Sequence, residues 1–221
     1  MNEWTTDFIA LAREVEALRF GRFELKSGRI SPYFFNAGRF CTGASLARLA
    51  DCYADAIADH CAAHDVEFDV LFGPAYKGIP LSAAVAVRLL DRHGIDVPVA
   101  YNRKEAKDHG EGGTLVGAPV EGRVLVIDDV LSAGTAFAEA RRMIEAAGGR
   151  VVAFAVGLDR QERGTDRTSA GSQLKAAGID VIAIATLADL VDALRQTPAR
   201  HAPESADLSA MLDYQREYGA A

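Results

Sequence analysis

Residues 123–136, which read RVLVIDDVLSAGTA, constrain the fold of this chain more than any other segment. Residues 124–127 are an unbroken apolar run rich in β-branched residues. Such a run is typical of a strand buried on both faces of a parallel sheet, because a half-exposed strand would alternate. Asp128 and Asp129 end the run, and a loop of small residues leads into a helical pattern. Residues 151–156 then form a second apolar strand pattern. We therefore predict a βαβ unit with its turn at the carboxyl end of a strand, where open α/β sheets bind ligands.

The rest of the chain extends this alternation of strands and helices. Residues 1–40 predict a first helix capped by Thr6 or Asp7 and a small antiparallel hairpin, which we call the hood. After the hood, the apolar patterns predict a helix at 44–63, a strand at 70–72 and a helix that ends at about 92. They then predict a strand at 97–101 and a loop at 102–113, and, after the βαβ unit, a strand at 179–184 and a helix at 187–194. The fold class is α/β, with a doubly wound, mostly parallel sheet and a small N-terminal hood. We expect one domain over 1–221, with the hood in about 1–40, the core in 44–195 and a C-terminal helix at 207–218.

Composition excludes several classes of function. The net charge of −7 argues against general binding to nucleic acid or to anionic membranes. No apolar run approaches the roughly 20 residues needed to span a bilayer, and the N-terminus lacks the pattern of a signal peptide. Cys41, Cys52 and Cys61 fit neither a disulfide framework nor a C-x-x-C metal spacing. These features favour a cytoplasmic protein.

The turn after residues 124–127 has the chemistry of a sugar-phosphate site. Ser132, Gly134 and Thr135 precede a helix, so unpaired backbone N–H groups and the helix dipole can hold a phosphate dianion. Asp128 and Asp129 suit sugar hydroxyls or a magnesium ion that travels with a polyphosphate. A strand end with solvated acids and a capped helix is the alternative for these two carboxylates taken alone. The other common phosphate motifs, G-x-x-x-x-G-K-[ST] and G-x-G-x-x-G, are absent.

Two further segments carry possible phosphate ligands. Residues 73–78, GPAYKG, follow another strand and contain Lys77, so they form either an ordinary strand-to-helix turn or a second phosphate loop. Residues 103–109 place Arg103, Lys104, Lys107 and His109 close together and are followed by three glycines. This segment is either a solvated surface loop or a cationic lid over a polyphosphate.

Five segments together resemble a known family. Residues 124–136 resemble the phosphoribosyl pyrophosphate signature of the type I phosphoribosyltransferases, and RKEAKDHGEGG resembles the catalytic loop of the orotate phosphoribosyltransferases within them. LKSGRISPYFFNAG is similar to the hood of that family, FGPAYKGIP to its pyrophosphate loop and LDRQERG to its segment after a sheet strand. The segments occur in the family's order. One departure is Ser132, where the bacterial pattern often has Thr.

The resemblance implies a reaction and a set of roles. The reaction transfers ribose 5-phosphate from 5-phosphoribosyl 1-pyrophosphate (PRPP) to N1 of orotate, giving orotidine 5′-monophosphate and pyrophosphate, in de novo pyrimidine (UMP) biosynthesis. The implied catalytic residues are Lys107, Asp128 and Asp129. The implied PRPP-binding residues are Lys26, Tyr76, Lys77, Arg103, Lys104, Lys107, His109, Asp128, Asp129, Val130, Leu131, Ser132, Ala133, Gly134, Thr135 and Ala136. The implied orotate-binding residues are Phe34, Phe35, Ser132 and Arg160.

The same resemblance implies Mg²⁺ carried mainly by PRPP and pyrophosphate, with no metal ligand assigned to the protein. It also implies a homodimer with shared active sites and a cis peptide bond between Ala75 and Tyr76. Without the resemblance, Arg160 would be expected to pair with Asp159 or Glu162 on the surface. Two other functions stay open on the sequence: a phosphoribosyltransferase for another base, such as a purine, and a regulator that senses PRPP and binds nucleic acid.

Overall fold

A mostly parallel six-stranded sheet forms the centre of the computed structural model, which describes residues 1–25, 28–107, 113–131, 135–164, 168–196 and 205–220. The strand order is β5-β4-β3-β6-β7-β8, and only the β4–β5 pair is antiparallel. The strands are β3 (Val70–Gly73), β4 (Val99–Lys107), β5 (Gly113–Gly117), β6 (Gly122–Leu131), β7 (Gly149–Asp159) and β8 (Asp180–Thr186). The predicted doubly wound α/β fold is confirmed.

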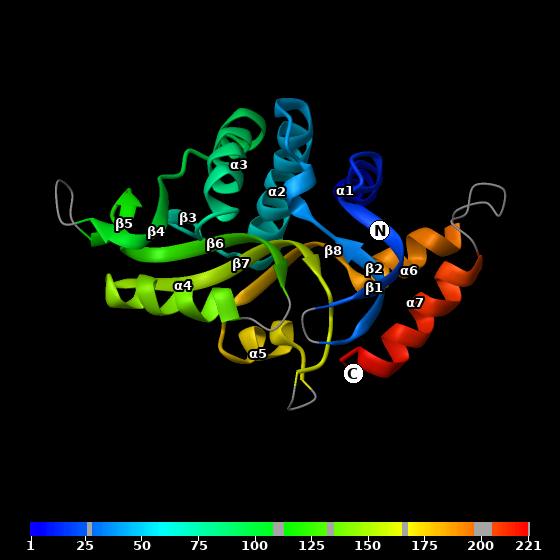
Figure 1. Ribbon diagram of the computed structural model, residues 1–221. Helices are drawn as coiled ribbons and strands as arrows, with labels where there is room; N and C mark the ends of the chain where they lie inside the picture. Colours follow the sequence, from blue (N-terminus) through cyan, green and yellow to red (C-terminus); the bar gives the residue numbers. More distant parts are fainter. Residues whose placement is uncertain (26–27, 108–112, 132–134, 165–167, 197–204, 221) are drawn as a thin grey trace.

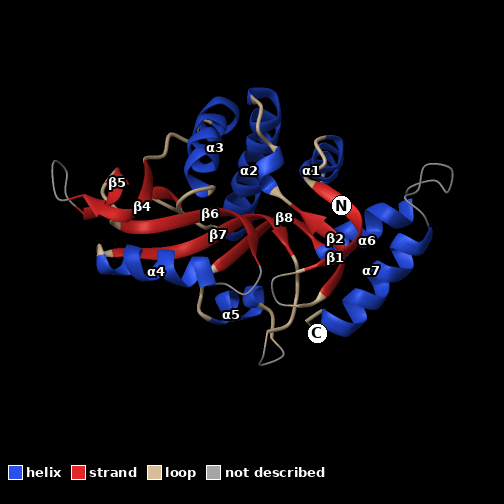
Figure 2. Ribbon diagram, in the orientation of Figure 1, coloured by secondary structure: helices blue, strands red, loops and turns tan. Residues whose placement is uncertain are grey.

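Helices cover both faces of this sheet (Figure 1). One face carries α1 (Glu3–Glu14), α2 (Gly43–His64) and α3 (Gly78–His93), and the other carries α4 (Thr135–Ala146) and α5 (Ala170–Ala176) (Figure 2). Alternate side chains of β6 enter the two separate cores: Leu125 and Ile127 pack with the first layer, and Val124 and Val126 with the second. All four are fully buried. This double burial explains why the segment has no polar alternation.

The hood is a separate two-stranded antiparallel sheet of β1 (Leu18–Glu24) and β2 (Ile30–Phe35), as predicted. Near it lie α6 (Leu187–Gln196) and the C-terminal helix α7 (Ser205–Tyr218), at the β8 end of the molecule (Figure 1). The rings of Tyr33 in β2 and Tyr214 in α7 meet edge to face at 6.2 Å. The hood and the C-terminal helix therefore pack against one another.

Three local predictions were wrong. β6 does not end at Ile127 but continues to Leu131, because Val130 and Leu131 pair with the end of the long strand β7. β4 extends through Lys107, where a loop was expected, because β5 pairs with it as an antiparallel strand. The glycines before and within β5 give no strand signal in the sequence. Helix α1 begins after Asn2, before both expected caps, and ends at Glu14.

The turn between β3 and α3 depends on two glycines that touch. A Cβ atom added to Gly73 would lie 2.3 Å from the carbonyl oxygen of Gly78 and 2.3 Å from Oγ of Ser82. A Cβ atom on Gly78 would in turn lie 2.8 Å from the carbonyl carbon of Gly73. Both distances are far inside van der Waals contact, so only glycine allows this close approach of the strand end to the first turn of the helix.

We expect Gly73→Ala to lower the free energy of unfolding by about 1–3 kcal/mol, because the added methyl group must push α3 away from β3. Urea unfolding would measure the change. Gly43→Ala is the matched control, since it lies at the start of α2 with open space around its Cβ position. The control should change stability by about 0.5 kcal/mol or less. Equal effects of the two substitutions would contradict the packing argument.

Candidate active site

The carboxyl ends of β3 and β6 bring a lysine and two carboxylates together. β3 and β6 are neighbouring parallel strands, so the loop after β3 lies beside the end of β6. Nζ of Lys77 lies 2.5 Å from Oδ2 of Asp129. The lysine side chain is mostly exposed, whereas that of Asp129 is 15% exposed. The loop after β3 and the carboxylate pair at the end of β6 therefore lie next to one another.

Asp128 is held in place by its neighbours and is largely buried. Its Oδ1 accepts a hydrogen bond from the backbone N–H of Asp129 at 2.8 Å, and its carbonyl oxygen accepts one from the Tyr53 hydroxyl at 2.8 Å. Burial, together with the charge of Asp129, raises the pKa of the Asp128 carboxyl to about 6. A ligand that brings hydroxyl donors or positive charge to these carboxylates would stabilise their ionised form.

The end of β4 supplies cations next to the loop after β3. Nζ of Lys104 lies 5.0 Å from the centroid of the Tyr76 ring, and Tyr76 is 65% exposed. The backbone N–H of Ala75 donates to Oδ1 of the buried Asn102 at 2.9 Å. The Ala75–Tyr76 peptide is cis, as expected. Sequence reasoning missed Asn102; its only signal is a polar residue directly after an apolar strand.

The two phenylalanines predicted for orotate point to different surroundings. Phe35 packs against Phe8 and Phe40 at centroid distances of 5.9 and 6.3 Å, which places it against the core. Phe34 lies 5.5 Å from Phe23, and the guanidinium carbon of Arg19 lies 5.7 Å from its ring. Neighbouring side chains of a strand point to opposite faces. The structure therefore does not join the two rings in one aromatic wall.

Arg160, predicted to bind the orotate carboxylate, is 7% exposed and lies in a polar network. Its Nε donates to Oε1 of Glu162 at 2.7 Å, and its Nη2 makes longer contacts of 3.3 Å to Oγ of Ser31 and 3.4 Å to the hydroxyl of Tyr214. The alternative pairing with Glu162 is therefore present, although the pair is buried rather than on the surface. In the described part of the chain, no hydrogen bond is made by Nη1 of Arg160.

Several sequence-predicted site residues cannot be placed. Lys26, His109, Ser132, Ala133 and Gly134 lie outside the described residues, as do the side chains of Lys107, Thr135 and Ala136. Of the remaining phosphate-loop residues, Leu131 is buried and Val130 is half-buried at the end of β6. The described helix α4 begins at Thr135, so the loop does lead into a helix N-terminus as predicted.

The described residues hold no group of three or more His, Cys, Asp or Glu side chains that could bind a metal ion. Asp128 and Asp129 could still supply two carboxylate oxygens to a magnesium ion whose other ligands are phosphate oxygens and water. Both carboxylates suit such a donor set. An added cation would reduce the repulsion between them and would favour the ionised form of the buried Asp128. Among the helices of the described chain, none is long and apolar enough to cross a membrane.

Comparisons with known proteins show which family of proteins this chain is similar to. The family model described as "Phosphoribosyl transferase domain" matches residues 45–186. An orotate phosphoribosyltransferase of Thioalkalivibrio sulfidiphilus is 52% identical over 220 residues, covering 99% of this chain and 100% of the relative. One from Xanthomonas campestris is 60% identical over 195 residues, covering 86% and 87%. The crystal structure of the Francisella tularensis orotate phosphoribosyltransferase aligns with a TM-score of 0.81 and 39% identity, covering 96% of this chain and 95% of that one.

The raised pKa of Asp128 predicts a pH dependence of stability. Because its folded-state pKa lies above the ordinary value of 3.8, the folded protein binds the extra proton, and this stabilisation is lost as pH rises through about 6. We compare the free energy of unfolding of Asp128→Asn with that of the wild type. The difference, variant minus wild type, should be about 2 kcal/mol more favourable to the variant at pH 7.5 than at pH 4. Urea unfolding without substrate at both pH values measures this difference. A gap between variant and wild type that does not change with pH would contradict it.

Proposed function

The chain belongs to the orotate phosphoribosyltransferases within the phosphoribosyl transferase family, and from this premise we propose that it transfers ribose 5-phosphate from PRPP to N1 of orotate. The products are orotidine 5′-monophosphate and pyrophosphate, a step of de novo pyrimidine biosynthesis. The observation that carries the proposal is the meeting of Lys77, Asp128 and Asp129 at neighbouring strand ends. A phosphate-binding cation beside two carboxylates matches a substrate that joins phosphates to a sugar with free hydroxyls.

The chemistry calls for electrostatic stabilisation rather than a protein nucleophile. The bond between C1 of the ribose and the pyrophosphate oxygen breaks, its electron pair leaves with pyrophosphate, and N1 of orotate forms the new bond to C1. Positive charge develops on the ribosyl ring and negative charge on the leaving group. We assign Asp128 and Asp129 to the ribose hydroxyls, where their negative charge also favours the ribosyl cation. Orotate can react as an anion, so no general base is assigned.

The phosphate ligands are proposed from position and from the family pattern. Val130 and Leu131 lead into Ser132, Ala133, Gly134, Thr135 and Ala136, whose backbone N–H groups at the start of α4 would bind the 5′-phosphate. Tyr76, Lys77, Arg103, Lys104 and His109 would bind the pyrophosphate, with Lys26 also on the phosphate side. Lys107 is the proposed catalytic cation, because it would stabilise the negative charge that develops on the leaving group in the transition state.

Magnesium is proposed as the cofactor, carried into the site mainly by PRPP. When bound, it would neutralise charge on the pyrophosphate oxygens. Among the described residues, Asp128 and Asp129 could contact it, although no protein ligand is required for an ion that PRPP carries. We further propose that residues 1–221 form one domain and that the protein is cytoplasmic. The three cysteines support a reducing compartment, since all are unpaired and burial raises the pKa of the Cys52 thiol to about 12, which keeps it unreactive.

Orotate differs from uracil by a carboxylate next to the attacking nitrogen, and Arg160 is the proposed partner of that group. Ser132 and the backbone at Phe34 and Phe35 would help to hold the ring. Because Nε and Nη2 of Arg160 already have partners, Nη1 is the nitrogen proposed to donate to the carboxylate. A single donor on a buried guanidinium would still discriminate strongly against a neutral base, since the charge would otherwise lack this anionic partner.

A panel of bases tests the function. We expect pyrophosphate release from PRPP with orotate and little with uracil, adenine, guanine or xanthine. Arg160→Ala should lower kcat/KM for orotate by a factor that corresponds to about 2–4 kcal/mol, while the KM for PRPP changes little. A preference for a purine would replace orotate as the substrate. The absence of release with any base would favour the regulator.

A homodimer with shared active sites is proposed as the assembly. The α3 helix supports it, because Pro80, Ala83, Val87 and Leu90 lie along one exposed face, with Val87 57% and Leu90 49% exposed. An apolar stripe of this kind on a helix is typical of a surface that another chain covers. The stripe begins three residues after Lys77, so a second chain docked on it would lie next to the active site.

Mixed dimers test the sharing of sites. Chains carrying Lys107→Ala and chains carrying Asp128→Asn should each be nearly inactive alone. If Lys107 acts on the partner's site, half of the dimers in a random mixture are mixed and each has one intact site, so activity should recover to about one quarter of the wild type. Leu90→Asp in both chains should abolish dimers and this recovery together. Mixed dimers that form without any recovery would contradict shared sites.

A further inference from the structure

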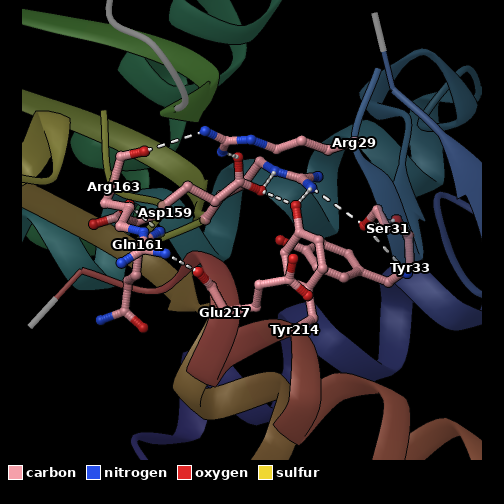
Figure 3. Close-up of polar contacts among 10 residues, drawn as sticks. Arg29, Ser31, Tyr33, Asp159, Gln161, Arg163, Tyr214 and Glu217 are labelled. Carbon is pink, nitrogen blue, oxygen red and sulfur yellow. Dashed lines mark hydrogen bonds and ion pairs between the residues drawn. The ribbon is translucent and has the colours of Figure 1, made fainter. Parts of the chain in front are cut away.

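The C-terminal helix α7 is joined to the segment that carries Arg160. The backbone N–H of Arg163 donates to the carbonyl oxygen of Tyr218 at 2.9 Å, and that of Ala220 donates to the carbonyl oxygen of Gln161 at 2.8 Å. These bonds run side by side in an antiparallel bridge, so the end of the chain holds residues 161–163 directly. Figure 3 shows Tyr214 from this helix next to Tyr33 and Ser31 from the hood.

Glu162 lies at the centre of this contact and accepts three hydrogen bonds. Its Oε1 accepts from Nε of Arg160 at 2.7 Å and from the hydroxyl of Tyr214 at 2.7 Å, and its Oε2 accepts from Nη1 of Arg29 at 3.2 Å. The side chain of Glu162 is 12% exposed and that of Arg160 8%. One carboxylate therefore binds the buried guanidinium of Arg160, the partly exposed guanidinium of Arg29 and the phenol of Tyr214.

Tyr214 completes the hold on Arg160. Its hydroxyl, which donates to Glu162, also lies 3.4 Å from Nη2 of Arg160 as an acceptor. Its ring meets that of Tyr33 edge to face, and the guanidinium carbon of Arg160 lies 4.5 Å from the centroid of the Tyr33 ring. The guanidinium is thus limited on one edge by Glu162, on a second by Tyr214 and Ser31, and on one face by Tyr33.

Charge in this cluster is unbalanced. Arg29 and Arg160 share the single carboxylate of Glu162. Oδ1 of Asp159 accepts a hydrogen bond from the backbone N–H of Gln161, and Asp159 forms no ion pair with either of these two guanidinium groups. A buried guanidinium that shares its carboxylate with a second guanidinium is only partly neutralised, and it therefore attracts a further anion. Orotate brings one such anion, in its carboxylate, to the proposed site.

We propose that Glu162 and Tyr214 are positioning residues that orient the Arg160 guanidinium and present Nη1 to the carboxylate of orotate, so that α7 contributes to the choice of base. This inference rests on the proposed role of Arg160. A pre-oriented guanidinium loses little freedom when it binds, whereas an unrestrained one must be ordered by the substrate. The cost of losing this orientation should fall on orotate and not on PRPP, whose proposed ligands lie in other segments.

Tyr214→Phe is the first test, because it removes the hydroxyl and keeps the ring that packs on Tyr33. We expect kcat/KM for orotate to fall roughly tenfold, the scale of one hydrogen bond in a charged network, with the KM for PRPP within about twofold. Tyr218→Phe is the matched control on the same helix and should leave both values near the wild type.

A double-mutant cycle decides whether Tyr214 acts through Arg160. In an Arg160→Ala background, Tyr214→Phe should have almost no additional effect on orotate kinetics. Independent, additive losses would overturn the inference and leave Tyr214 with a structural role. If Arg160→Ala itself impairs orotate use but Tyr214→Phe does not, the inference alone fails. If Arg160→Ala has no effect on orotate, the proposed orotate-binding role of Arg160 and this inference fail together.

Discussion

The burial of β6 on both faces is the constraint on which the rest of this structure depends. Residues 124–127 alternate between two apolar cores, so no polar side chain fits along this run. Polar residues enter β6 only outside the run: Arg123 precedes it, and Asp128 and Asp129 follow it. Because β3 runs parallel beside β6, its own end delivers Lys77 to the same edge. The location of the site is thus a consequence of where the double burial stops.

The same geometry makes the carboxylate pair unfavourable by itself. Asp128 is largely buried next to Asp129, and both effects oppose its ionisation. Lys77 offsets part of this, since its ammonium lies against Asp129. A substrate that offers hydroxyl groups to the carboxylates and phosphate to the ammonium would replace the contact of Lys77 with Asp129 by better partners on both sides. Such a substrate would therefore offset the electrostatic cost of placing Asp128 in a buried position next to Asp129.

Local patterns predict those features of the molecule that depend on local forces. The apolar run 124–127 specified a strand buried on both faces, the small residues before α4 specified a helix start, and residues 20–38 specified a separate hairpin. The errors in the two strands share one cause, namely a partner strand elsewhere in the chain. β6 continues beyond its apolar run because β7 is long enough to pair with Val130 and Leu131, and β4 continues through charged residues because β5 returns beside it. Neither partner changes the periodicity of the strand that it extends.

The environment of Arg160 shows the same limit at the site itself. The sequence offered Glu162 as a surface partner two residues away, and the pairing is real, but its burial comes from β2 and α7. Ser31 and Tyr214 lie 129 and 54 residues from Arg160 along the chain, so no local sequence pattern could predict their contacts with it. Burial changes what the arginine can do. On the surface its pairing with Glu162 would be worth little, and solvent would screen its charge from a ligand. Because the side chain of Arg160 is only 8% exposed, sharing the Glu162 carboxylate with Arg29 leaves positive charge on Arg160 that a bound anion would offset. In the proposed role of Arg160, a base without a carboxylate would leave that charge unsatisfied, and this would disfavour a neutral base relative to orotate.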